Sequence, residues 1–167
     1  MSSLSFNHPT LIIMVGCSGS GKTTWVHKHL DHLKPTIICA DDFCVDLDGV
    51  YTFSHDGVQA AHCCVRRAFN EATDRQDPLI VMDNTNLHSH HRQRYIDWCR
   101  KLGYQVFIVA LDVTPEIGAL RTPHHVPAHG IEGQRKRCDI GVPGVYYIPV
   151  KRPASNPLLD RHDAIAL

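Results

Sequence analysis

The sequence has no excess of charge of either sign, because 17 Lys and Arg residues balance 17 Asp and Glu residues. A chain without net charge has no global field to attract nucleic acid, and this argues against a binding module that works by overall charge. Any contact with nucleic acid must come from a local cleft. An enzyme that touches one chain end remains compatible with this composition.

Long apolar runs are also missing. No stretch approaches the roughly 20 residues that a membrane-spanning helix needs. The segment Met1–Pro9 lacks the charged region and small-residue cleavage site of a signal peptide. We therefore expect a cytoplasmic protein with no membrane partner. Its 167 residues, 43% hydrophobic and 20% charged, suit one globular domain.

Cysteines spaced as Cys-x-x-Cys are absent, although the chain contains seven Cys and 13 His. The odd count, and the placement of several cysteines in expected strands or helices, predict reduced thiols rather than a disulfide framework. His62, Cys63 and Cys64 are adjacent on an expected helix, where neighbouring side chains point to different faces. We therefore expect no structural zinc.

A glycine-rich segment, Gly16–Thr23, fits the pattern G-x-x-x-x-G-K-[ST] at every fixed position. In such a phosphate-binding loop (P-loop), glycines let main-chain N–H groups turn toward phosphate oxygens, and the next helix adds its positive N-terminal end. Lys22 is expected to reach the β- and γ-phosphates, and the Thr23 hydroxyl to hold Mg²⁺. No N-K-x-D segment for guanine follows, so ATP is favoured over GTP. The expected nucleotide-binding residues are Gly16, Cys17, Ser18, Gly19, Ser20, Gly21, Lys22, Thr23, Thr24 and Arg121.

Short apolar runs alternate with segments of helical periodicity. Strands are expected at residues 10–15, 36–40, 79–82, 104–111 and 145–150, and helices from the glycine-rich turn to 33, at 56–73, at 89–102, from 114 onward, and in a short segment ending near 137. This alternation predicts an α/β P-loop NTPase fold: a parallel sheet of about five strands, helices on both faces and a small helical lid. We expect one P-loop kinase domain at residues 1–152 and a C-terminal tail at 153–167.

Carboxylates follow two of the expected strands, at the edge where ligands bind to such sheets. Asp41 and Asp42 come directly after the second strand, and a kinase needs a carboxylate to orient the acceptor hydroxyl and accept its proton. We assign that role to Asp41, with Asp42 as a turn residue. Asp83 ends the third strand, in the position of a Mg²⁺-binding carboxylate, and Asn84, Thr85 and Asn86 are expected to orient loops or substrate.

Together these sites resemble the polynucleotide 5′-hydroxyl kinase family of P-loop proteins. The resemblance covers about residues 10–137. It is carried by Gly16–Thr24, Ala40–Phe43, Asp48–Phe53, Ala61-His62, Val81–Leu87, Leu102–Val106 and Arg121–Pro127.

The resemblance implies an ATP-dependent kinase that transfers the γ-phosphate to a hydroxyl on DNA or RNA. It implies that Lys22, Asp41, Asp83 and Arg121 are catalytic and that Thr23 and Asp83 bind the metal. Arg121 corresponds to the arginine that opens the lid over ATP, and Arg135 and Arg137 follow on the expected lid helix.

Two departures leave the acceptor open. Cys44 stands where the phage enzyme has an arginine, and Arg121-Thr122 replaces the usual Arg-Asn. The alternatives are a kinase acting on a hydroxymethylated base such as 5-hydroxymethyluracil in phage DNA, a small-molecule P-loop kinase, and a nucleotide-dependent binding module without transferase activity. The sequence does not choose between DNA and RNA and does not indicate an oligomeric state.

Overall fold

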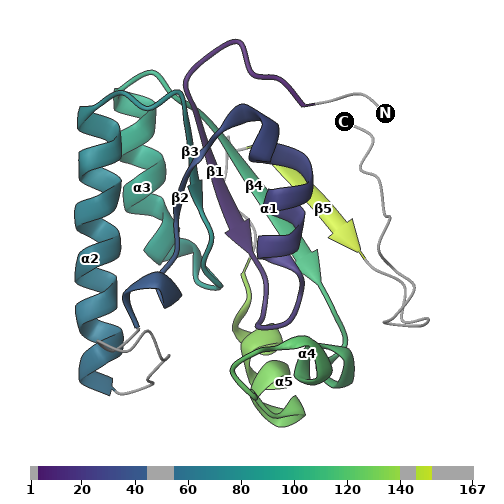
Figure 1. The fold of residues 1–167 in the computed structure, drawn as a ribbon. Coiled ribbons are helices and arrows are strands. Elements are labelled where there is room, and N and C mark those ends of the chain that lie inside the picture. The colour runs from purple at the N-terminus through teal and green to yellow at the C-terminus, as the bar shows by residue number, and fades with distance from the viewer. Residues whose placement is uncertain (1–3, 45–54, 140–145, 152–167) are drawn as a thin grey trace.

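Apolar strands pair in parallel at the centre of the structure, a computed structural model that describes residues 4–44, 55–139 and 146–151. The sheet has five strands in the order β2-β3-β1-β4-β5 (Figure 1). Their bounds are Thr10–Val15 for β1, Thr36–Ile38 for β2, Leu79–Met82 for β3, Gln105–Asp112 for β4 and Tyr146–Lys151 for β5. The predicted parallel sheet of about five strands is confirmed.

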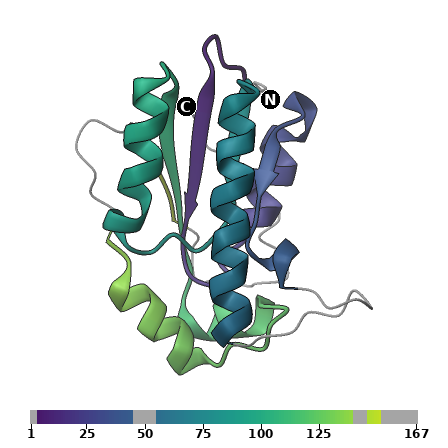
Figure 2. The same ribbon diagram turned by 90° about the vertical axis from the view of Figure 1, so that its left-hand side faces the viewer.

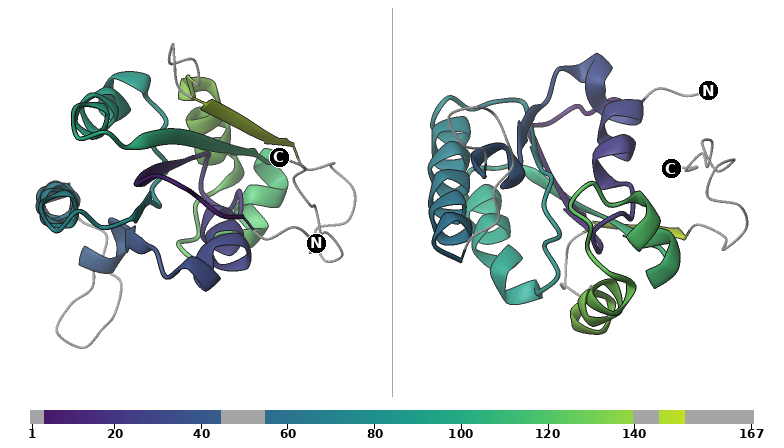
Figure 3. Two further views of the ribbon diagram at one scale, coloured as in Figure 1. Left: turned by 90° about the horizontal axis from the view of Figure 1, so that it is seen from above. Right: turned by 60° about the horizontal axis from the view of Figure 1, so that its bottom comes forward.

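Helices cover both faces of the sheet, as predicted. The longer α2 (His55–Asp74) and α3 (Ser89–Lys101) lie side by side on one face (Figure 2), and α1 (Lys22–Leu30) lies on the other. Viewed from above, the sheet runs between these two layers (Figure 3). The remaining helices are α4 (Pro115–Arg121), α5 (Ala128–Arg137) and the single-turn 3₁₀ helices η1 (Asp31–Leu33) and η2 (Asp41–Phe43). None of the helices in the described part of the chain is long and apolar enough to span a membrane.

The central strand β1 explains why the sequence pattern is a continuous apolar run rather than an alternation. Leu11, Ile13 and Val15 pack in the core cluster shared with α2 and α3, and all three are fully buried. Ile12 and Met14 point the other way, into the cluster that contains residues of α1. A strand buried on both faces must be apolar at every position.

Several element boundaries differ by a few residues from the sequence-based expectation. Strand β2 ends at Ile38 rather than Ala40, because the N–H of Ala40 donates to the side-chain Oδ1 of Asn84 at 2.7 Å and the chain then turns into η2. Helix α5, for which the sequence predicted only an end near residue 137, begins at Ala128 and includes Gly130. The N–H of Gly130 donates to the carbonyl of Pro127 at 2.8 Å, so the helix starts directly after that proline.

The carboxyl ends of the strands lead into the segments that the sequence singles out. Gly16 follows β1, Asp41 follows β2 closely and Asp83 follows β3. Helices α4 and α5 lie beyond the same edge of the sheet (Figures 1 and 3). The division into a domain at 1–152 and a tail at 153–167 stays a prediction, since the tail lies outside the described residues.

A buried arginine braces the loop after β3. The side chain of Arg92 is fully buried, and its guanidinium donates to the carbonyl oxygens of Asn86 and Asp139 and to the Oδ1 of Asp139 at 3.3 Å. Asn86 in turn donates from Nδ2 to the carbonyl of Met14 at 2.9 Å. Arg92 therefore joins the ends of β1 and β3 to the segment after α5.

We predict that Arg92→Met destabilises the fold by at least about 2 kcal/mol, because it leaves the carbonyls of Asn86 and Asp139 without their donors. Methionine retains the unbranched stem, so the loss reports on the guanidinium. Urea denaturation measures the difference, and Lys101→Met is the control, because Lys101 is exposed on the same helix and should cost less than about 0.5 kcal/mol. Equal stability of the two variants would refute the brace.

Candidate active site

The loop Gly16–Gly21 adopts a conformation that only glycine tolerates at key points. Gly19 has φ of +73°, and a Cβ there would lie 2.1 Å from the carbonyl oxygen of Gly118 in α4. At Gly16 a Cβ would lie 2.5 Å from the carbonyl oxygen of Leu111. The main chain therefore approaches two neighbouring segments too closely for any side chain, in agreement with the expected close-packed P-loop.

Lys22 begins helix α1 and folds back over the loop. Its Nζ donates to the carbonyl of Gly16 at 3.2 Å and to that of Cys17 at 3.0 Å. Burial lowers the pKa of the Lys22 ammonium, and the negative charge of Asp83 opposes this effect. The ammonium therefore lies at the loop, in a partly desolvated place where an anionic ligand would stabilise its charge.

Thr23 and Asp83 meet although they are 60 residues apart in the sequence. The Thr23 hydroxyl donates to Oδ2 of Asp83 at 2.6 Å. The Asp83 side chain is buried, and its Oδ1 has no hydrogen-bond partner among the described residues. Burial raises the pKa of the Asp83 carboxyl, while the Thr23 hydroxyl and the Lys22 charge lower it.

This pair of oxygen groups fits a magnesium ion. Mg²⁺ prefers oxygen ligands and is commonly held by one or two protein groups together with substrate phosphates and water. The unpartnered Oδ1 of Asp83 and the Thr23 hydroxyl supply such oxygens next to the loop. In the described part of the chain, no group of three or more His, Cys, Asp or Glu side chains could hold a metal ion. A site for Mg²⁺ would therefore depend on the nucleotide for its remaining ligands.

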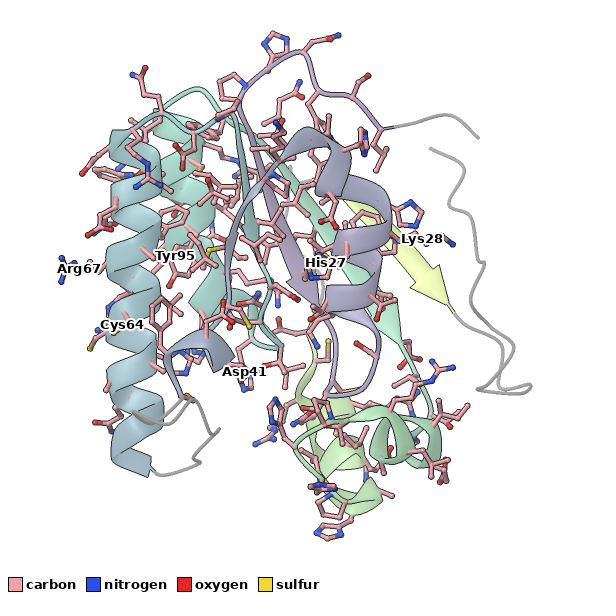
Figure 4. All side chains as sticks on the ribbon, in the orientation of Figure 1. His27, Lys28, Asp41, Cys64, Arg67 and Tyr95 are labelled. Atoms are coloured by element: carbon pink, nitrogen blue, oxygen red, sulfur yellow. The ribbon has the colours of Figure 1, made fainter. Side chains whose placement is uncertain are left out.

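Asp41 lies on η2 and faces the same edge of the sheet (Figure 4). The N–H of Ala40, which precedes Asp41, donates at 2.7 Å to Oδ1 of Asn84, which follows Asp83, so the ends of the paired strands β2 and β3 are joined next to both aspartates. Oδ2 of Asp41 also lies 3.2 Å from Nε2 of His124, which follows α4. The structure thus brings together Lys22, Thr23, Asp83 and Asp41, as the sequence predicted.

The arginines of the helical lid are placed differently from one another. Arg121 is the last residue of α4 and is half-buried. Arg135, which we expected as a candidate lid arginine, instead forms a two-point ion pair with Asp112 at 2.9 and 3.0 Å. Arg137 is exposed and donates to the carbonyl of Gly133 at 3.1 Å. The pairing with Asp112 gives Arg135 a structural contact at the end of β4.

Two of the remaining polar candidates, Asn84 and Asn86, form hydrogen bonds with the main chain near the strand ends. Asn84 accepts from the N–H of Ala40, and Asn86 donates to main-chain carbonyls at the ends of β1 and β3. Cys44, at the position that has an arginine in the resembling family, is buried at 7% exposure, and burial raises the pKa of its thiol. This position therefore supplies no positive charge to an acceptor.

Sequence patterns missed two residues that contact the predicted site. His124 touches Asp41, and Gln134 on α5 contacts Ser18 in the loop. His124 lies within the stretch Arg121–Pro127 that carries the resemblance, but the sequence assigned no role to it, and Gln134 lies outside all of those stretches. Gln134 is 116 residues from Ser18, so only the packing of α5 on the loop reveals this contact.

Comparison with known proteins agrees with this geometry. Residues 11–134 match the protein family described as "AAA domain". A candidate kinase from Chloroflexus aurantiacus has a TM-score of 0.64 at 18% identity, with 93% of this chain and 94% of that chain covered. A gluconokinase from Sinorhizobium meliloti has a TM-score of 0.57 at 16% identity, with 89% and 86% covered.

A third structure is that of the Pnkp1/Rnl/Hen1 RNA repair complex, with a TM-score of 0.59 at 17% identity. Here 80% of this chain is covered but only 45% of the other. At such identities the similarity shows the fold alone, and it confirms the predicted P-loop NTPase fold.

We predict that Asp83→Asn raises the melting temperature at pH 7 without nucleotide and Mg²⁺. Burial raises the folded-state pKa of Asp83, so this carboxyl weakens the fold as pH rises through that pKa, and asparagine removes the effect. Each kcal/mol corresponds to a shift of about 2–4 °C for a chain of this size.

The difference in melting temperature between wild type and Asp83→Asn should shrink as pH falls below the Asp83 pKa. In a separate measurement at pH 7, adding ATP and Mg²⁺ should raise the melting temperature of the wild type more than that of the variant. Thermal melts over a pH series measure both effects, and a variant less stable than wild type at pH 7 without ligands would contradict the prediction.

Proposed function

The chain belongs to the family described as "AAA domain" and has a P-loop kinase-like fold, and from this premise we propose that it is an ATP- and Mg²⁺-dependent kinase that phosphorylates a hydroxyl group on nucleic acid. The observation that supports the proposal is that Asp41 lies at the sheet edge that also holds Lys22, Thr23 and Asp83, because β2 pairs with β3 and Ala40 is hydrogen-bonded to Asn84. A nucleotide-dependent switch needs Lys22, Thr23 and Asp83 to bind the nucleotide and its metal ion. It does not need a further carboxylate such as Asp41 to accept a proton from an acceptor.

Each group has a place in the transfer. Lys22 and the loop amides bind the β- and γ-phosphates, and Thr23 and Asp83 would hold Mg²⁺, whose charge would offset that of the phosphate oxygens. Asp41 accepts the proton of the acceptor hydroxyl as that oxygen bonds to the γ-phosphorus. The bond from the γ-phosphorus to the bridging oxygen breaks, and ADP leaves. Arg121 is proposed to stabilise the charge of the transferring group.

The proposal also names the molecule that carries the acceptor hydroxyl. Nucleic acid is supported by the resemblance to polynucleotide 5′-hydroxyl kinases and by the fold shared with a chain of an RNA repair complex. Buried Cys44 supplies no charge for a phosphate next to the acceptor hydroxyl. This observation favours an acceptor with little phosphate near Asp41, such as a hydroxymethylated base in DNA, as the second candidate.

A small-molecule acceptor is the third candidate, because the fold is also shared with a gluconokinase and a sugar kinase. A binding module without transferase activity is disfavoured by the position of Asp41.

We predict that Asp41→Asn lowers phosphate transfer by about 10²–10⁴-fold, because the amide cannot accept the hydroxyl proton. ATP binding should stay within about twofold of wild type, because the loop and Lys22 are unchanged. Transfer of ³²P from γ-labelled ATP and equilibrium nucleotide binding measure the two effects. Asp42→Asn is the matched control, since Asp42 is exposed on the same turn and should retain transfer. Full transfer by Asp41→Asn would remove this residue from the mechanism.

We also predict which acceptors become labelled. A panel of γ-labelled ATP reactions with 5′-hydroxyl DNA and RNA, DNA containing 5-hydroxymethyluracil, and sugars should show label in a nucleic acid. Lys22→Ala should abolish that label, since it removes the ammonium that reaches the β- and γ-phosphates. Label only in sugars would move the assignment to a small-molecule kinase. Tight ATP binding without label in any acceptor would favour the binding module.

A further inference from the structure

The side chain of Gln134 on α5 makes two hydrogen bonds to the P-loop. Its Oε1 accepts from the main-chain N–H of Ser18 at 2.7 Å, and its Nε2 donates to the Ser18 hydroxyl at 3.2 Å. A carboxamide carries a carbonyl acceptor and an NH₂ donor on one carbon, so it can make both bonds without a change of protonation. Both polar ends of Gln134 are therefore used on one loop residue.

The loop residues on either side of Ser18 are held by the same helical pair. Gly19 lies against the main chain of Gly118 in α4, so closely that no side chain fits between them. Cys17 is buried in a small apolar cluster with Val113 and the fully buried Ile131 of α5. Three consecutive loop residues thus contact α4 or α5.

Gln134 itself is held in place by its helix. One residue further along, Arg135 forms its two-point ion pair with Asp112 at the end of β4. One turn earlier, Ile131 is fully buried. These two contacts fix the position of α5 relative to the sheet, so the carboxamide reaches Ser18 from a rigid support.

A P-loop binds phosphate well only if its N–H groups are already turned inward, because ordering the loop on binding would cost free energy. Ser18 immediately precedes Gly19, where the chain enters a left-handed conformation with φ of +73°. Anchoring the Ser18 N–H fixes the peptide that leads into this turn. The contact therefore favours the loop shape that receives phosphates.

We propose that Gln134 is a positioning residue for nucleotide binding, which acts through Ser18 to hold the P-loop in its phosphate-binding shape. The identity of the nucleotide as ATP rests on the proposed function. In this arrangement α5 belongs to the nucleotide site, although Gln134 does not have to touch the phosphates.

The test uses the full chain and Gln134→Met, which keeps the unbranched stem and removes both polar ends. Affinity for a fluorescent ATP analogue with Mg²⁺ should fall about 5–10-fold, the effect of losing one or two hydrogen bonds. In transfer assays the KM for ATP should rise by the same factor, while the KM for the acceptor stays unchanged. A role in folding alone would not separate the two KM values.

Three further variants sharpen the test. Ser18→Ala keeps the main-chain bond and removes only the weaker one, so its effect should stay under about threefold. Gln134→Glu keeps the acceptor and loses the donor, and its charge near the phosphates should weaken binding at least as much as methionine does. Lys136→Ala is the control, because Lys136 is 74% exposed on the same helix and should bind normally.

The outcomes separate this proposal from the proposed function. Normal affinity in Gln134→Met, with Lys22→Ala unable to bind, would refute the role of Gln134 and leave the kinase assignment standing. Retained ATP binding in Lys22→Ala would count against the nucleotide site itself. If Gln134→Met fails to fold, Gln134→Asn replaces it, because it stays uncharged but is one methylene too short to make both bonds to Ser18; normal affinity in that variant would overturn the proposal, and reduced affinity would support it.

Discussion

The hydrogen bond between Thr23 and Asp83 joins the start of α1 to the end of β3, and the candidate site is built around it. Strands β1 and β3 are paired neighbours in the sheet, so the segments that follow them emerge side by side. This places the loop, its lysine and the buried carboxylate at one edge. The neighbouring position of β2 then brings Asp41 to the same edge.

The candidate site holds two ionisable groups, Lys22 and Asp83, in a buried environment that disfavours charge. Burial disfavours the ionised forms of both Lys22 and Asp83, and their mutual attraction offsets only part of this effect. The triphosphate and divalent cation of the proposed function would supply the opposite charge to each group. Such a site is less stable alone than with its ligand, which is typical of functional sites in general.

Polar residues of α5 and of the segment between α4 and α5 make contacts with different parts of the structure. Arg135 stabilises the seating of α5 through Asp112, whereas Gln134, the next residue, contacts the loop. His124, between the two helices, reaches Asp41. Helix α5 therefore contacts the predicted nucleotide side of the site, and the segment between α4 and α5 contacts the predicted acceptor side.

The sequence by itself determined the parallel sheet, the loop and the positions of Asp41 and Asp83, because these depend on local periodicity and on short motifs at strand ends. It could not show that Arg135 pairs with Asp112, that Cys44 is buried, or that Gln134 and His124 reach the site. Those contacts join residues between 23 and 116 positions apart. Their geometry follows from how α5 and the preceding segment pack on the sheet edge, and no local spacing encodes that packing.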